Sequence, residues 1–200
     1  RVAPYEIGAD RLEQAYENCP KALIEALEHA AANIRDYNEK LLAKTVEWNS
    51  PDGGRVGRVV RGLSRVGIYV PGGRALYPST VLMDSIPAKI AGCGELVITT
   101  PPNAQGKVNP VILAAAHIAG VDRIFKVGGA QAIAALAYGT ASVPKVDKIV
   151  GPGNAFVAEA KKVIADIHSR NKMPILVGGT GLYFSSLVDN LTFSEEKDTS

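Results

Sequence analysis

Short β-branched runs alternate with helical segments from Val66 onward, and this alternation restricts the fold more than any other feature of the chain. The five runs are GIYVPGG, ELVITTPP, RIFKVGG, DKIVGPG and PILVGGTG. Segments with helical apolar periodicity cover residues 79–91, 108–119, 130–138, 155–170 and 182–191. Alternation of this kind indicates βαβ units with right-handed crossovers. We therefore predict an α/β fold with an open, mostly parallel five-stranded sheet, doubly wound in a Rossmann-like or a flavodoxin-like order.

The N-terminal third follows a different pattern. Leucine and isoleucine recur there at helical spacing within a charged background, at Leu23, Ile24, Leu27, Ile34, Leu41 and Leu42. A Pro-Asp-Gly-Gly turn signal at residues 51–54 lies between valine-containing runs, which is typical of a β-hairpin. We predict a helical and hairpin extension over residues 1–65, the α/β domain over 66–193, and a tail over 194–200.

Composition and charge argue against several classes of protein. A net charge of +2, from 22 Lys and Arg against 20 Asp and Glu, gives no strong field for nucleic acid or anionic membranes. The sequence contains no apolar run of the roughly 18 residues that a membrane-spanning helix needs. Cys19 and Cys93 lack the spacing of metal or redox sites. We expect a cytoplasmic protein that binds neither nucleic acid nor membranes.

Four of the five predicted strands run directly into glycine, in the turns that begin at Gly72, Gly128, Gly151 and Gly178. The ligand crevice of an open parallel sheet lies outside the carboxyl ends of its strands, where glycine lets backbone N–H groups approach a ligand. Glycine can equally well end a strand and open a helix. The turns match neither GxGxxG nor GxxxxGK[ST], so the glycines alone do not establish nucleotide binding.

Three polar residues share these strand ends, namely Tyr69, Gln131 and Asn154. Each also has a structural explanation. Tyr69 can pack in the sheet, Gln131 can lie on a helix surface, and Asn154 is an ordinary helix N-cap residue. The residue types alone therefore leave a binding role and a structural role open.

The run from Val66 to Lys162 closely resembles histidinol dehydrogenase. The matching motifs, in family order, are RVGIYVPGG, STVLM, IPAKIAGC, VGGAQAIAALAYGT, VPKVDKI and GPGNAFVAEAKK, and NIRDYNEK and the PDGG hairpin match as well. This resemblance implies a dimeric enzyme that uses zinc and oxidises L-histidinol to L-histidine in two NAD-dependent steps. Mapped by motif, the NAD-contacting positions of that family correspond to Tyr69, Gln131 and Asn154. The resemblance thus implies NAD as a cofactor.

The sequence leaves this pattern after GPGNAFVAEAKK. The following text, DIHSRNKMPILVGGTGLY, resembles tRNA dimethylallyltransferase, and GGTGLY is its most distinctive match. The P-loop of that family has no counterpart in this chain, so neither ATP-like binding nor prenyl transfer is implied. We hypothesise a chimera, engineered or recombined, of residues 1–162 from the first family and 163–193 from the second. Its junction lies within residues 155–165, where one amphipathic helix continues across the join.

The zinc ligands and the acid–base pair that the resemblance implies determine which activity we expect. The resemblance implies that zinc is bound by Gln, His, Asp and a second His, with a Glu-His acid–base pair, all in segments after the divergence. The three histidines of this chain, His29, His117 and His168, match none of those positions. We therefore predict no catalytic or metal-ligating residues, no zinc, and no native catalysis.

Two alternatives stay open. The chain can be an NAD-dependent histidinol dehydrogenase whose site is completed by another chain, or a module that retains NAD binding without chemistry. Self-association is a further expectation, because loss of a partner half would expose apolar surface.

Overall fold

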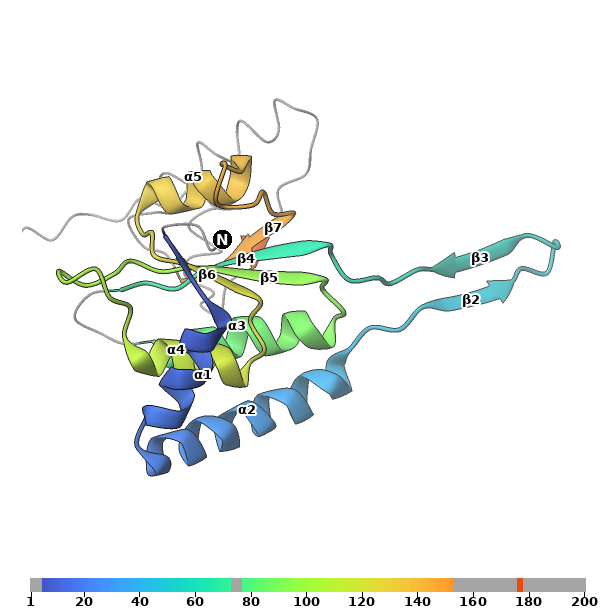
Figure 1. The fold of residues 1–200 in the computed structure, drawn as a ribbon. Helices are drawn as coiled ribbons and strands as arrows, with labels where there is room; N and C mark the ends of the chain where they lie inside the picture. Colours follow the sequence, from blue (N-terminus) through green and yellow to red (C-terminus); the bar gives the residue numbers. More distant parts are fainter. Residues whose placement is uncertain (1–4, 73–76, 153–175, 178–200) are drawn as a thin grey trace, which may run out of the picture.

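The computed structural model describes residues 5–72, 77–152 and 176–177. In this part of the chain, helices cover both faces of a six-stranded mixed sheet, and a two-stranded hairpin extends away from the body (Figure 1). The predicted helices over 155–170 and 182–191 lie outside the described residues. None of the described helices is both long enough and apolar enough to cross a membrane.

Five parallel strands form the main part of the sheet. They are β4 (Arg65–Tyr69), β5 (Glu95–Thr99), β6 (Arg123–Phe125), β7 (Lys148–Val150) and β8 (Leu176–Val177). They lie side by side in the order β6-β5-β4-β7-β8, and every neighbouring pair is parallel. The predicted α/β fold with a mostly parallel five-stranded sheet is confirmed. Counted along the chain, the order is 3-2-1-4-5, which differs from the flavodoxin-like order 2-1-3-4-5.

A sixth strand, β1 (Glu6–Ile7), was not predicted. It pairs antiparallel with the edge strand β6, with Glu6 opposite Phe125 and Ile7 opposite Ile124. The Arg123 guanidinium donates from Nε to Glu6 Oε1 at 2.5 Å and from Nη2 to Glu6 Oε2 at 2.9 Å. This bidentate pair fixes the N-terminal strand on the edge of the sheet.

Two helical layers enclose the sheet. The helices α1 (Ala9–Asn18), α2 (Lys21–Leu41), α3 (Pro78–Ile90) and α4 (Pro110–Ile118) lie on one side, and α5 (Ala130–Tyr138) lies on the other (Figure 1). Leu12 and Leu27, from the first two helices, belong to the same hydrophobic cluster as the strand residues. The N-terminal helices therefore contribute to the core, while the domain boundary at residue 65 stays a prediction.

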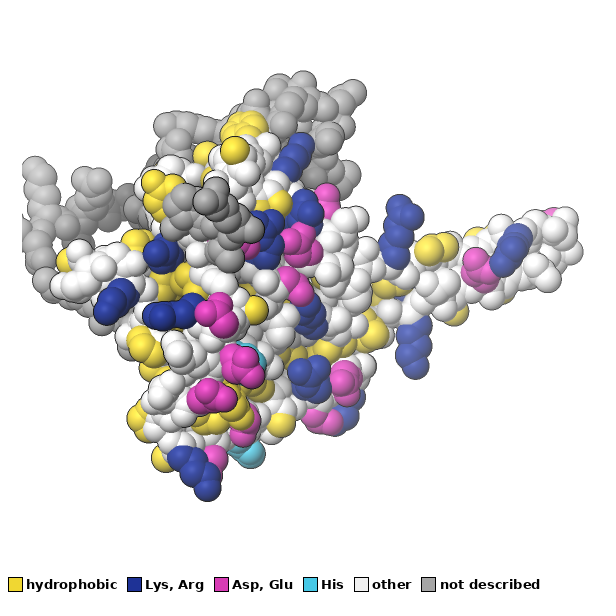
Figure 2. Space-filling view, in the orientation of Figure 1, with side chains coloured by type: hydrophobic (Ala, Val, Ile, Leu, Met, Phe, Trp, Pro, Cys, Tyr) yellow, Lys and Arg dark blue, Asp and Glu magenta, His cyan; other side chains and the backbone are white. Residues whose placement is uncertain are grey.

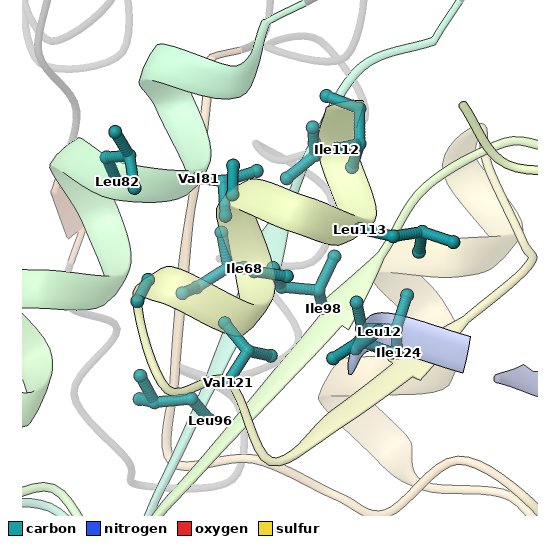
Figure 3. Packing of buried hydrophobic residues seen from close by; sticks show 14 of the residues in the cluster. Leu12, Ile68, Val81, Leu82, Leu96, Ile98, Ile112, Leu113, Val121 and Ile124 are labelled. Atoms are coloured by element: carbon teal, nitrogen blue, oxygen red, sulfur yellow. The ribbon is translucent and has the colours of Figure 1, made fainter. Parts of the chain in front are cut away.

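Successive side chains of β5 point to opposite faces of the sheet and pack into the apolar clusters on both faces. Leu96 and Ile98 are fully buried in the large cluster beneath α3 and α4 (Figure 3). Val97 points the other way, into a smaller cluster with Leu136 of α5. Because successive residues of a strand face opposite sides of the sheet, a strand covered on both faces is expected to be apolar at every position, with no alternation of apolar and polar residues. Each such buried side chain contributes about 1.5–3 kcal/mol.

The predicted hairpin is confirmed. Strands β2 (Val46–Asn49) and β3 (Arg55–Arg58) pair antiparallel, and the chain reverses through Gly53, whose φ of 82° favours glycine. All eight strand residues are exposed, and the ribbon projects from the body (Figure 1). A two-stranded ribbon alone is marginally stable in water, so this arm is poorly supported by the rest of the described chain.

Candidate functional site

The order of the strands reverses between β4 and β7, because the chain passes from β4 to β5 on one side and from β7 to β8 on the other. In open α/β sheets, a ligand crevice lies outside the carboxyl ends of the strands at such a reversal. Here those ends are formed by Tyr69, the last residue of β4, by Val70 after it, and by Gly151 after β7. We call the region outside these ends, where the fold rule places a ligand, the strand-end cleft.

Gly151 brings the ends of β4 and β7 unusually close together. A Cβ atom at this position would lie 2.2 Å from the carbonyl oxygen of Tyr69, and the φ of Gly151 is +142°. Only glycine fits this contact, because any side chain would push the two strand ends apart. One wall of the cleft therefore depends on backbone-to-backbone packing.

Pro101 packs closely against the glycine turns that follow β4 and β6. A Cβ atom at Gly72 would lie 2.5 Å from Pro101 Cγ, and one at Gly128 would lie 2.4 Å from Pro101 Cβ. The proline ring thus fills the space between two of the predicted glycine turns. For these two glycines, close packing is an observed requirement, whether or not a ligand also uses the turns.

Tyr69 ends β4 on the face covered by α5. Its side chain is buried, with 5% of its surface exposed. The phenol oxygen accepts a hydrogen bond from the Gly129 N–H at 3.3 Å. Gly129 has a φ of +76° and lies directly before the first residue of α5. Tyr69 therefore supports the turn from which α5 begins.

Gln131 lies in the first turn of α5 and is exposed. Its Oε1 lies 2.8 Å from the point that a Cβ atom on Gly129 would occupy. The structure thus gathers two of the three predicted cofactor residues, Tyr69 and Gln131, around Gly129. The third, Asn154, lies outside the described residues.

The start of α5 also offers backbone donors. Among the described residues no side chain caps this helix at Gly129, and its first turn contains no acidic residue. Unpaired N–H groups and the positive end of the helix dipole favour a negatively charged ligand at such a position. The strand ends can therefore offer the Gln131 carboxamide and the N–H groups at the start of α5 to one ligand.

Thr99 was not predicted as a site residue; it ends β5 between Tyr69 on β4 and Phe125 on β6. Its side chain is fully buried, and among the described residues its Oγ1 has no hydrogen-bond partner. A threonine at the end of an ELVIT run looks like an ordinary strand residue. Only the three-dimensional neighbourhood reveals that its hydroxyl is unpaired.

The titratable groups with perturbed pKa values belong to other parts of the fold. Burial raises the pKa of Asp84, on α3, to about 6. Burial lowers the pKa of Lys148, at the start of β7, and the nearby Cys93 opposes this shift. Residues 84 and 148 do not belong to the carboxyl ends of the strands, so neither is a candidate for the cleft.

Within the described ranges, no group of three or more His, Cys, Asp and Glu side chains is placed to hold a metal ion. His117, on α4, lies against Tyr16 of α1 with ring centroids 5.0 Å apart. His29, on α2, contacts Asn33 at 3.3 Å. Both histidine side chains are exposed on the helical layer, and His168 lies outside the described residues. The residues present in this part do not assemble a zinc site.

A sequence profile of the family described as histidinol dehydrogenase matches residues 1–175. The chain belongs to the histidinol dehydrogenase family. The histidinol dehydrogenase of Oceanobacillus iheyensis is 54% identical over 164 residues, which are 82% of this chain and 38% of that protein. The enzyme of Nitrosospira multiformis is 56% identical over 161 residues, covering 80% of this chain and 36% of that protein.

A solved structure agrees with this membership. The crystal structure of histidinol dehydrogenase from Elizabethkingia anophelis superimposes with a TM-score of 0.78 at 35% sequence identity. The match covers 90% of this chain and 40% of that one. This member of the histidinol dehydrogenase family thus spans about two fifths of the length of its relatives.

A second family also matches the chain. The profile described as IPP transferase covers residues 153–200, so residues 153–175 are matched by both families. The predicted junction within residues 155–165 falls inside this overlap. Strand β8, at residues 176–177, lies beyond the histidinol dehydrogenase match and pairs parallel with β7.

Proposed function

We propose that this chain is a dinucleotide-binding α/β module of the histidinol dehydrogenase family that binds NAD but does not turn over by itself. The observation that carries the proposal is the meeting of Tyr69 and Gln131 at Gly129, beside the strand-order reversal. Membership of the family supports NAD as the ligand, and the Rossmann-like strand order supports the position of the cleft.

The cleft fits NAD in its chemistry. The N–H groups at the start of α5 suit the pyrophosphate, and the carboxamide of Gln131 can donate to or accept from a ribose or nicotinamide. NAD supplies a hydride acceptor when it is bound. The residues of this chain bind and orient it, and the proposal assigns them no proton transfer.

The absence of turnover rests on how much of the family this chain contains. It covers 38% of the Oceanobacillus iheyensis enzyme, and the family resemblance puts the zinc ligands and the Glu-His pair in later segments. We therefore propose that catalysis needs groups that these 200 residues do not supply. The prediction that zinc is not bound rests on the sequence alone, since membership of a zinc-using family gives it no support.

We further propose that the chain is a chimera whose last part comes from a tRNA-dimethylallyltransferase-like protein. The IPP transferase match to residues 153–200 supports this origin. The parallel pairing of β8 with β7 also supports it, because a strand from the second family then extends the sheet of the first. The carbonyl and N–H groups of the β7 edge are thereby paired.

Calorimetric titration with NAD tests the binding proposal. We expect heat of binding for the wild-type chain at millimolar NAD, and at least fivefold weaker binding for Gln131→Ala and for Asn154→Ala. Gln14→Ala is the matched control, because Gln14 is an exposed glutamine on α1, outside the strand ends. Absence of heat for the wild type would refute NAD binding. Equal weakening by Gln14→Ala would refute the assigned position.

Self-association is a second proposal, supported by the hairpin. Val46 and Trp48 lie on one face of the ribbon together with Val56, the register partner of Trp48. Their exposed fractions are 50%, 56% and 44%. Hydrophobic and charged side chains both line the projecting arm (Figure 2). A ribbon with one exposed apolar face can bury that face against a second copy of the chain.

The remaining expectations stay proposals as well. A net charge of +2 supports the proposal that the chain binds neither nucleic acid nor anionic membranes. The cytoplasmic location follows from the low cysteine content, since two cysteines in 200 residues do not require an oxidising compartment.

A further inference from the structure

The hydroxyl of Thr99 has no evident structural purpose. Among the described residues, Thr99 Oγ1 and Ser85 Oγ are the two buried side-chain polar atoms without a hydrogen-bond partner. Both side chains are fully buried. A buried hydroxyl without a partner destabilises the folded state, because it has lost its hydrogen bonds to water. Such a group in a native fold therefore calls for an explanation.

Packing does not explain the hydroxyl. Val97, two residues earlier on the same strand face, and Phe125, beside Thr99 on β6, belong to the apolar cluster under α5. Valine has the same shape as threonine without the polar atom, so valine would fill this position without an unpaired hydroxyl.

The position of Thr99 connects it with the strand-end cleft. It is the register partner of Tyr69, so the two side chains lie next to each other on the face covered by α5. Two residues further along, Pro101 packs against the Gly128 turn, which leads into α5. Thr99 is therefore the neighbour of Tyr69, whose phenol oxygen accepts the hydrogen bond from the Gly129 N–H at the start of α5.

We propose that Thr99 is a positioning residue of the cofactor cleft, whose hydroxyl gains a hydrogen-bond partner only when a dinucleotide is bound. This inference rests on the proposed NAD binding and adds a residue to that site. Access to the buried hydroxyl requires the Gly128-Gly129 turn to move, and glycine gives that turn the necessary backbone freedom. A polar atom of the dinucleotide then takes the place that no protein atom fills in the described structure.

Thr99→Val and Thr99→Ser separate this role from a purely structural one. We expect Thr99→Val to weaken NAD binding about fivefold to tenfold while its melting temperature rises or stays unchanged. Thr99→Ser keeps the hydroxyl and should bind NAD within about twofold of the wild type. Opposite effects on binding and stability would not arise from damage to the fold, which lowers both.

Ser85→Ala is the matched control, since Ser85 is the other buried unpartnered hydroxyl and lies on α3, on the opposite side of the sheet. It should change stability without changing NAD affinity. If the wild type binds NAD and Thr99→Val binds it equally well, the role of Thr99 is refuted while the proposed function stands. If the wild type does not bind NAD, the proposed function fails and this inference fails with it.

Discussion

The phenol oxygen of Tyr69 accepts a hydrogen bond from the N–H of Gly129 at 3.3 Å, across 60 residues of sequence. The bond joins the end of the central strand β4 to the turn that starts α5. One predicted cofactor residue thereby supports the backbone that carries another, Gln131. The cleft is therefore a coupled arrangement, and changes in Tyr69 should affect both stability and binding.

Removal of the Tyr69 hydroxyl tests this coupling. Tyr69→Phe leaves the Gly129 N–H without its acceptor, so we expect the free energy of unfolding to fall by about 1 kcal/mol. NAD affinity should change as well, because the bond holds the turn that must move when a dinucleotide binds. Urea unfolding and NAD titration measure the two effects. Tyr37→Phe, at an exposed position on α2, should change neither quantity, and a Tyr69→Phe protein with unaltered stability and binding would contradict the coupling.

Alanine at Gly151 tests the close approach of β4 and β7. The new Cβ would lie 2.2 Å from the Tyr69 carbonyl oxygen, so the strand ends must separate. We expect destabilisation by about 2–4 kcal/mol, measured by urea unfolding. Gly54→Ala is the control, because its nearest contact would be an ordinary 3.6 Å to Ser50 Oγ. Equal stability of the two variants would show that the contact at Gly151 is unimportant.

The raised pKa of Asp84 predicts how the stability of the protein depends on pH. Burial raises its pKa from 3.8 to about 6, so the folded state binds this proton more tightly than the unfolded state. Stability should therefore be greatest below pH 4 as far as this group is concerned, and should fall as the pH rises from about 4 to about 6. The full contribution is at most about 3 kcal/mol.

Asp84→Asn removes this half-buried charge and should stabilise the protein above pH 6 while flattening its pH dependence between pH 4 and 6. Urea unfolding at several pH values measures both effects. Asp52→Asn, at an exposed position in the hairpin turn, should leave the pH profile of the wild type unchanged. If Asp84→Asn shows the same pH dependence as the wild type, Asp84 does not carry this effect.

Trp48 tests the proposed self-association. Trp48→Ser removes the largest exposed apolar side chain from the hairpin face and should shift the chain toward the monomer. Sedimentation velocity over a range of concentrations measures the shift. Tyr5→Ser provides the control, because Tyr5 is 63% exposed but lies beside the sheet edge rather than on the hairpin. A wild-type chain that stays monomeric at high concentration would refute the proposal.

Local sequence patterns predicted much of this fold because they act within single elements. The predicted helix over residues 130–138 coincides with α5 (Ala130–Tyr138), and the turn signal at 51–54 lies between β2 and β3. The two-residue strand β1 was missed because Glu6 and Ile7 are too few to show alternation. Its place in the sheet depends on the distant Arg123, which local pattern does not reveal.

The residues of the cleft also divide into those that local sequence patterns predict and those that depend on the packed structure. Tyr69 and Gln131 were singled out from their positions at strand ends, and the structure brings both to Gly129. The order of the strands was left open by the sequence because it depends on which crossovers run to which side. The unpaired hydroxyl of Thr99 was missed because burial and missing partners are properties of the packed structure.

We propose that this chain binds NAD without oxidising histidinol by itself. The most direct test adds NAD, zinc and L-histidinol to the purified 200-residue chain and follows NADH absorbance, with NAD binding measured calorimetrically on the same sample. We expect heat of NAD binding and no histidinol-dependent NADH above a protein-free blank. Formation of NADH that depends on both histidinol and the chain would contradict it and would favour a complete dehydrogenase.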